Sequence, residues 1–115
     1  MSSVDEGQLG ALVARLRDAG VRHVVATMVD SGSITRVKCF DLGDLASFAR
    51  SGSGFSTCWA RVLSNDHFTS TEALRGPVGD MHMLPYTAHV VQLAIAPKWA
   101  WTPMDLYDQE GAAFA

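Results

Sequence analysis

The stretch V-V-A-T-M-V-D-S-G-S-I-T-R-V-K-C-F, from Val24 to Phe40, consists of two strand-like runs that flank a polar turn. Val, Ile, Thr and Phe dominate both runs, as expected of half-buried strands. The turn at residues 30–33 contains an aspartate, which can bond its own backbone, and a glycine, which adopts positive φ without steric cost. We therefore predict an antiparallel hairpin with a loop of about three to five residues.

The second run of this hairpin places two cations on one side of the sheet. Side chains alternate along a strand, so Arg36 and Lys38 point the same way, together with Ile34 and Phe40. The two cations belong either to a solvated sheet face or to an edge that contacts an anion or an interface. The sequence leaves both interpretations open.

Length and composition indicate one domain over residues 1–115, with residues 1–6 disordered. The net charge of −3 argues against a nucleic-acid partner. The chain contains neither an apolar run of about 18 residues, as a membrane span needs, nor a signal peptide. We expect a cytoplasmic protein in which Cys39 and Cys58 are reduced, buried thiols.

One helix is predicted before the hairpin in the chain and a second after it. The first spans Gln8 to Ala19, and Gly20 is well placed to cap its C-terminus. Asp44 can cap a second, short helix that ends near Arg50. Apolar side chains at helical spacing carry these predictions: Leu9, Leu12, Val13, Leu16 and Ala19 in the first helix, and Leu45 and Phe48 in the second.

Further strands follow the second helix. Residues 51–54, S-G-S-G, are expected to form a flexible loop, and Pro103 argues that the last strand is an edge or contains a bulge. The element order predicts an α+β fold in which a mixed sheet of about four to six strands packs on one or two helices, as in β-grasp folds. The strands are predicted at 55–63, 80–86, 90–96 and 99–107, with a long connection at 64–79.

Motifs of self-sufficient active sites are missing from the sequence. It contains no P-loop, no dinucleotide-binding G-x-G-x-x-G and no H-E-x-x-H. The four histidines, at 23, 67, 82 and 89, are scattered without metal-ligand spacing, although His82 and His89 could meet across neighbouring strands. We expect no metal site.

Several segments, in order, resemble the N-terminal domain of the glutamine synthetase family. V-D-S-G-S-I-T-R-V-K at 29–38 is similar to the family's VD…G…R.K hairpin, and G-S-G-F-S-T-C-W at 52–59 stands in place of its GVGFDGSS loop. G-D-M-H-M-L-P-Y at 79–86 is similar to SDM.L.PD, and the run at 99–111 resembles an ending in CDLYDPDG. R-G-P-V-G-D-M and K-W-A-W-T-P point to divergent members that join glutamate, or similar acids, to amines other than ammonia.

The resemblance implies a β-grasp domain without the catalytic domain. In the family, the metal ligands, the ATP site and the glutamate-binding arginines lie in a larger C-terminal domain. We therefore expect no catalytic residue within this chain alone, and we expect ATP and Mg²⁺ (or Mn²⁺) on a partner that carries the catalytic domain.

The resemblance also implies where this chain meets substrate. The family's loop supplies an aspartate that helps to bind and deprotonate ammonium, and Ser56 stands in its place. A serine can neither balance an ammonium charge nor take its proton at neutral pH. Either the amine is larger and held otherwise, or the domain has lost that role. The amine-side residues, acting in trans, are Phe55, Ser56, Thr57 and Trp59, and Arg36 and Lys38 are candidate anion or interface contacts.

Two functions follow from the resemblance. The chain is either a subunit of a split ligase, inactive alone, that completes the active site of a partner, or a non-catalytic module that docks on a synthetase or another protein. It is expected to bind that partner or itself, with a small acid and amine at the shared site. A third interpretation, a domain of a longer ligase, leaves the residue roles unchanged.

Overall fold

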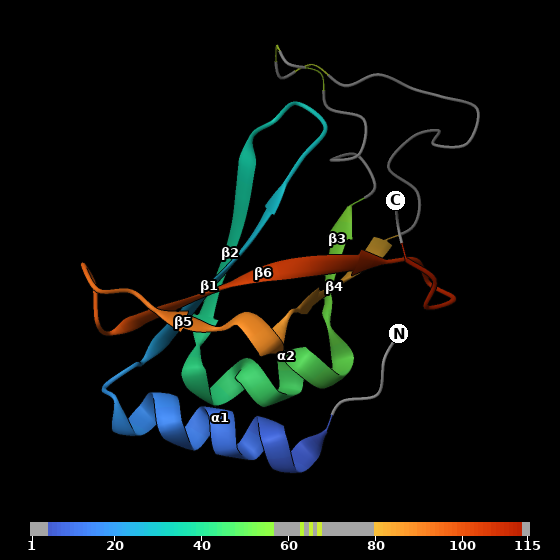
Figure 1. Cartoon of the computed structure of the whole chain (residues 1–115). Helices are drawn as coiled ribbons and strands as arrows, with labels where there is room; N and C mark the ends of the chain where they lie inside the picture. Colours follow the sequence, from blue (N-terminus) through green and yellow to red (C-terminus); the bar gives the residue numbers. More distant parts are fainter. Residues whose placement is uncertain (1–4, 57–62, 64, 66, 68–79, 114–115) are drawn as a thin grey trace.

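The computed structural model describes residues 5–56, 63, 65, 67 and 80–113 of the chain. These residues form a curled, mixed six-stranded sheet, and two α-helices lie on the same side of it (Figure 1). The predicted α+β class, with a β-grasp-like arrangement, is confirmed. None of the described helices is both long and apolar enough to cross a membrane.

The first helix, α1 (Glu6–Asp18), has well-formed ends. Asp5 caps its N-terminus, because its carboxylate accepts a bond of 3.1 Å from the backbone N–H of Gln8. Asp5 and Glu6, at the end of the predicted disordered terminus, therefore belong to the start of the helix. Gly20, with φ of 93°, follows the last turn as predicted. The apolar stripe buries Leu9 and Leu16.

The hairpin is confirmed as β1 (His23–Val29) and β2 (Thr35–Asp41), which pair antiparallel. Its turn differs from expectation in one detail. The positive φ of 64° belongs to Ser33, and Gly32 is not among the residues with positive φ. Asp30 explains this conformation, because its backbone and side chain accept the bonds that close the loop.

The second helix, α2 (Leu45–Ser51), follows a 3₁₀ turn, η1 (Leu42–Asp44). Asp44 makes no side-chain capping bond, because it is itself the last residue of that turn and has helical backbone angles. Leu45 is buried as predicted, and Phe48 stacks on Phe40 of β2 with ring centroids 4.5 Å apart. This contact fixes α2 beneath the hairpin.

The expected flexible loop at residues 51–54 is instead the end of α2 and the start of a strand, β3 (Ser53–Ser56). Gly52 makes the sharp change of direction with φ of 68°. A Cβ at this position would lie 2.9 Å from the carbonyl oxygen of Met83, so only glycine fits here.

The C-terminal half contributes β4 (Asp80–Pro85), a 3₁₀ turn η3 (Thr87–His89), β5 (Val91–Gln92) and β6 (Trp99–Tyr107). The strand predicted at 90–96 is wrong beyond residue 92. Backbone bonds from residue 93 to residue 99 and from residue 99 to residue 96 turn the chain there. Ile95, at the turn, is 95% exposed.

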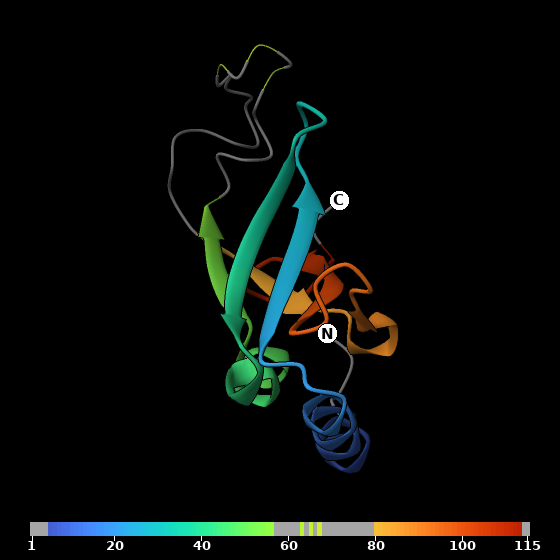
Figure 2. The same ribbon diagram turned by 90° about the vertical axis from the view of Figure 1, so that its left-hand side faces the viewer.

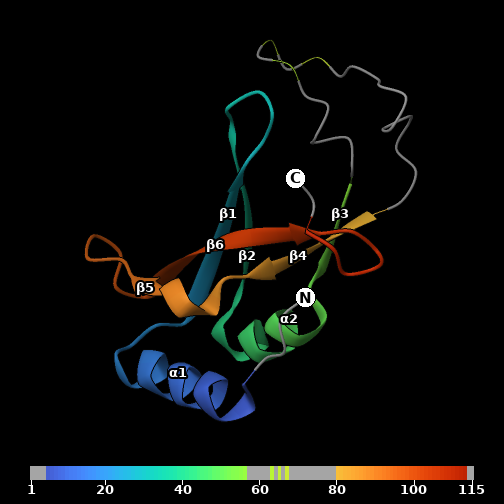
Figure 3. The same cartoon turned by 45° about the vertical axis from the view of Figure 1, so that its right-hand side comes forward.

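The strand order β2-β1-β6-β4-β3 makes β6 a central strand, so the prediction of an edge strand is wrong (Figure 3). β6 pairs parallel with β1 through Pro103 and antiparallel with β4 from Met104 onward. Pro103 has no backbone N–H to donate. It is tolerated because it lies where the pairing with β1 ends and the pairing with β4 begins.

The core consists of two clusters on the concave side of the sheet. One lies under the helices and the other lies between the hairpin and β4, and the half-buried Phe40 contacts both. The first comprises Leu9, Leu16, Val21, Val24, Leu42, Leu45, Ala49 and Ala100, and the second Ala26, Met83 and Met104.

The convex side of the hairpin is open to solvent. Cys39, expected to be buried, is an exposed free thiol there, because it alternates with the inward Lys38 and Phe40. Val37, on the same side, is 60% exposed. Cys58 lies outside the described residues.

Candidate functional site

The candidate amine-side segment begins at the end of β3. Phe55 lies opposite Met81 of β4, and Ser56 lies opposite Asp80. The Phe55 ring is half-buried and packs against the cluster of core residues that includes Met83. Thr57 and Trp59, the other two predicted site residues, fall outside the described residues, so their roles stay predictions.

Lys38 connects this segment to the hairpin. Its Nζ donates a bond of 2.5 Å to Ser53 Oγ and a longer one of 3.4 Å to the carbonyl oxygen of Gly54. Ser53 and Gly54 immediately precede Phe55 and Ser56 in β3. The structure thus places one of the two predicted cations next to the predicted substrate segment.

Arg36, the other cation, serves the hairpin turn. Its Nε donates a bond of 2.7 Å to Oδ2 of Asp30, whose side chain is completely buried. Oδ1 of the same carboxylate accepts bonds of 2.8 Å and 3.0 Å from the backbone N–H groups of Gly32 and Ile34. Neither of the two cations therefore projects freely into solvent.

The buried carboxylate remains ionised because its hydrogen bonds outweigh its burial. Burial raises the pKa of Asp30, whereas the bonds from Ile34, Arg36 and Gly32 and the charge of Arg36 lower it. The net effect holds the pKa of Asp30 below its ordinary value. Sequence reasoning identified the backbone bonds of Asp30 but missed its pairing with Arg36, six residues further along the chain.

The two cations consequently differ in charge balance. Arg36 faces a carboxylate, whereas the described partners of Lys38 Nζ are both neutral oxygens. Hydrogen bonds from an ammonium are stronger than those from a neutral donor, so neutral acceptors can still fix the side chain.

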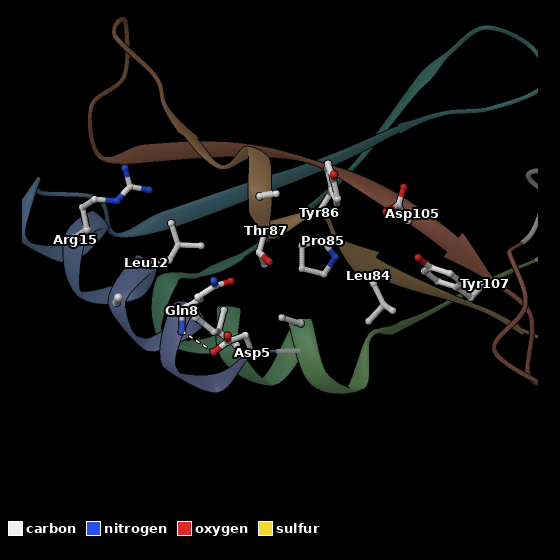
Figure 4. Close-up of a pocket in the computed structure, with 14 residues that line it drawn as sticks. Asp5, Gln8, Leu12, Arg15, Leu84, Pro85, Tyr86, Thr87, Asp105 and Tyr107 are labelled. Carbon is white, nitrogen blue, oxygen red and sulfur yellow. Dashed lines mark hydrogen bonds between the residues drawn. The ribbon is translucent and has the colours of Figure 1, made fainter. Parts of the chain in front are cut away.

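A groove of about 540 Å³ lies between α1, η3 and the ends of β4 and β6 (Figure 4). Apolar side chains such as Leu12 and Leu84 contribute to its walls, and Arg15, Asp105 and Tyr107 add polar groups. Among the predicted site residues that the structure describes, none lines it. Sequence reasoning missed the groove because its walls come from segments distant in the chain.

The described contacts of His82 and His89 are with other residues. His82 lies 3.2 Å from the side-chain oxygen of Gln109, and the ring of His89 packs on Tyr86 with centroids 5.1 Å apart. The expected meeting of His82 with His89 is not among these contacts. Within the described ranges, no group of three or more His, Cys, Asp and Glu side chains is arranged to hold a metal ion.

The sequence is similar to that of a known protein. It is 38% identical over 102 residues to the gamma-glutamylpolyamine synthetase GlnA3 of Streptomyces coelicolor, and the match covers 89% of this chain. That match relates the chain to the glutamine synthetase family. The chain spans only about a fifth of the relative, 22% of its length, and is the size of the family's N-terminal domain.

Solved structures agree on the fold. A GmaS/ADP complex and GmaS without ligand each match with a TM-score of 0.70 and 22% identity, covering 90% of this chain and about a fifth of theirs. A glutamine synthase homolog matches with a TM-score of 0.68 and 21% identity over 99% of this chain and 24% of its own. No protein-family model matches the sequence. The chain therefore has a fold found in proteins of the glutamine synthetase family and is related to ligases of that type.

Proposed function

We propose that this chain is the β-grasp subunit of a split, glutamine-synthetase-like ligase that joins a carboxylate to an amine at the expense of ATP. In this proposal it completes the amine side of an active site whose catalytic domain lies on a partner chain. The observation that carries the proposal is the 38% identity, over nearly the whole chain, to a gamma-glutamylpolyamine synthetase.

The partner supplies the nucleotide and metal site. A triphosphate with divalent cations needs clustered carboxylates and cationic groups, and the described residues of this chain offer no such metal-ligand group. We therefore assign ATP and Mg²⁺ or Mn²⁺ to the partner. There the γ-phosphoryl group passes to the substrate carboxylate, the amine nitrogen attacks the activated carbonyl carbon, and phosphate leaves.

This chain contributes the cover over the amine. Phe55 and the residues that follow it exclude water from an intermediate that water would hydrolyse, and they shape the amine pocket. Ser56 donates or accepts a hydrogen bond but cannot take the proton that the attacking amine loses. That proton therefore passes to a group on the partner.

The first test is native mass spectrometry of the protein isolated from its own host under gentle conditions. The proposal expects a complex with a second chain roughly three to four times as long, as the size of the relative suggests. That complex should turn over ATP only when both an acid and an amine are supplied. A lone monomer or homo-oligomer would contradict the proposal.

The alternative is a non-catalytic module that docks on a synthetase or another protein. Ser56, in the place of the family's aspartate, is the observation that favours it. Phe55→Ala and Trp59→Ala separate the two functions, with Val37→Ala as a control because Val37 is an exposed residue of β2 outside the candidate segment. A split ligase loses activity in the first two variants while the complex still assembles. A docking module supports full activity of its partner in all three.

A further inference from the structure

We propose that Lys38 is a positioning residue that holds β3, and with it the Phe55–Ser56 segment, against the hairpin. The position of β3 is a property of this chain alone. Its consequence for amine binding rests on the proposed function.

The strand order explains why β3 needs such a contact. β2 and β3 are the two ends of the path β2-β1-β6-β4-β3, and β3 pairs only with β4 among the described strands. β3 has four residues and is preceded by the sharp bend at Gly52. A short edge strand held on one side has few bonds to resist fraying.

Lys38 bridges the two ends of the curled sheet. β3 and β2 can be followed in Figure 2, and the Lys38 ammonium spans from β2 to Ser53 and Gly54. An aliphatic stem of four carbons can cross that space while the ammonium donates several bonds at once. The described bonds of Lys38 go to Ser53 and Gly54, whereas the carboxylate of Asp30 is bonded to Arg36.

The position of the two acceptors, on Ser53 and Gly54, connects Lys38 to the candidate substrate segment. Both belong to the first half of β3, and the candidate substrate residues form its second half. Movement of β3 away from β2 would therefore move Phe55 and Ser56 together. Lys38 does not itself need to touch substrate.

The first experiment measures amide hydrogen exchange of residues 54–56 by NMR in the isolated chain. Lys38→Met, which keeps the stem but removes the donors, should speed exchange there by about fivefold, the factor expected for one lost hydrogen bond. Lys38→Arg should restore slow exchange. The chain has only two lysines, so Lys98→Met is the matched control and should leave these amides unchanged.

A second arm does not depend on how well Lys38→Met folds. With labelled lysines, Ser53→Ala should move the Nζ signal of Lys38 but not that of Lys98. Unchanged exchange at residues 54–56 in Lys38→Met, or an unmoved Lys38 signal in Ser53→Ala, would overturn the proposal.

The third arm uses the complex with its partner. Lys38→Met should raise KM for the amine several-fold with a smaller effect on kcat, and Lys38→Arg should rescue it. An unchanged KM would overturn the link to amine binding. A complex with no ligase activity in any variant, including the unaltered chain, would instead contradict the proposed function and leave the exchange result standing.

Discussion

At the scale of single residues, Asp30 organises the hairpin turn. Its buried carboxylate accepts two backbone N–H groups within the loop and the Nε of Arg36 from the returning strand. An ionised group without access to water is tolerated only when it is paired in this way. Asp30 thus joins local turn chemistry to the orientation of a cation.

Asp30→Asn tests this role. The amide keeps the shape and one acceptor oxygen, but its NH₂ group cannot accept the bond from Arg36. We expect a lower urea midpoint for the variant, with the hairpin amide signals of residues 30–36 most affected. Asp105→Asn, an exposed carboxylate on β6, should leave the midpoint unchanged. Equal midpoints for the two variants would contradict the role of Asp30.

The lowered pKa of Asp30 also predicts a pH dependence. In the unfolded chain this aspartate has its ordinary pKa of about 3.8, so it binds the proton more readily than in the folded chain. The stabilisation is therefore complete above about pH 4 and is lost as the pH falls through the folded pKa. Urea unfolding at a series of pH values should show that the natural sequence loses stability as the pH falls, and that Asp30→Asn loses less. Parallel curves of stability against pH for the two proteins would refute this role of Asp30.

At the scale of elements, the junction between α2 and β3 decides where the candidate segment points. Gly52 turns the chain in a region of φ and ψ that is almost exclusive to glycine, and a Cβ there would lie 2.9 Å from the carbonyl oxygen of Met83. The sequence S-G-S-G indicated a loop at this position. β4 instead draws residues 53–56 into the sheet, because pairing satisfies their backbone groups.

Two glycine substitutions that should change the stability in opposite directions test this junction. Gly52→Ala should destabilise the fold by about 1–3 kcal/mol, because alanine is strained there and its Cβ approaches the Met83 oxygen. Gly10→Ala, in the middle of α1 with nothing within 4 Å of the new Cβ, should stabilise it by about 0.5–1 kcal/mol. Thermal unfolding measures both. Destabilisation of similar size in both variants would argue against the steric account.

At the scale of the whole molecule, the sheet has helices on its concave side, and strand residues such as Val29, Val37 and Val91 stay exposed. Single exposed apolar residues are normal on protein surfaces and identify no partner. The proposal of a partner rests instead on the likeness to a gamma-glutamylpolyamine synthetase.

The isolated chain should therefore show no ATP turnover that depends on an acid and an amine. The proposed function assigns the ligand groups for metal and nucleotide to the partner, so adding the catalytic chain should give turnover. The measurement is ADP release with and without that partner. Turnover by the pure chain would contradict the division of roles.

The sequence by itself determined the elements whose causes are local. The stripe from Leu9 to Leu16 and the cap at Gly20 specify α1, and the strand-like runs around the turn at 30–33 specify the hairpin. These features depend on residues a few positions apart, so patterns in the chain are enough to reveal them. The motif order also predicted a resemblance that agrees with the 38% identity to a gamma-glutamylpolyamine synthetase.

Only the tertiary structure decided the features that join distant segments. Pro103 suggested an edge, yet β6 is central because β1 and β4 pair with different halves of it. The contact between Lys38 and Ser53 crosses the gap between the two ends of the strand path. The curl of the sheet creates such contacts, and it results from the packing of all six strands and both helices together rather than from any single stretch.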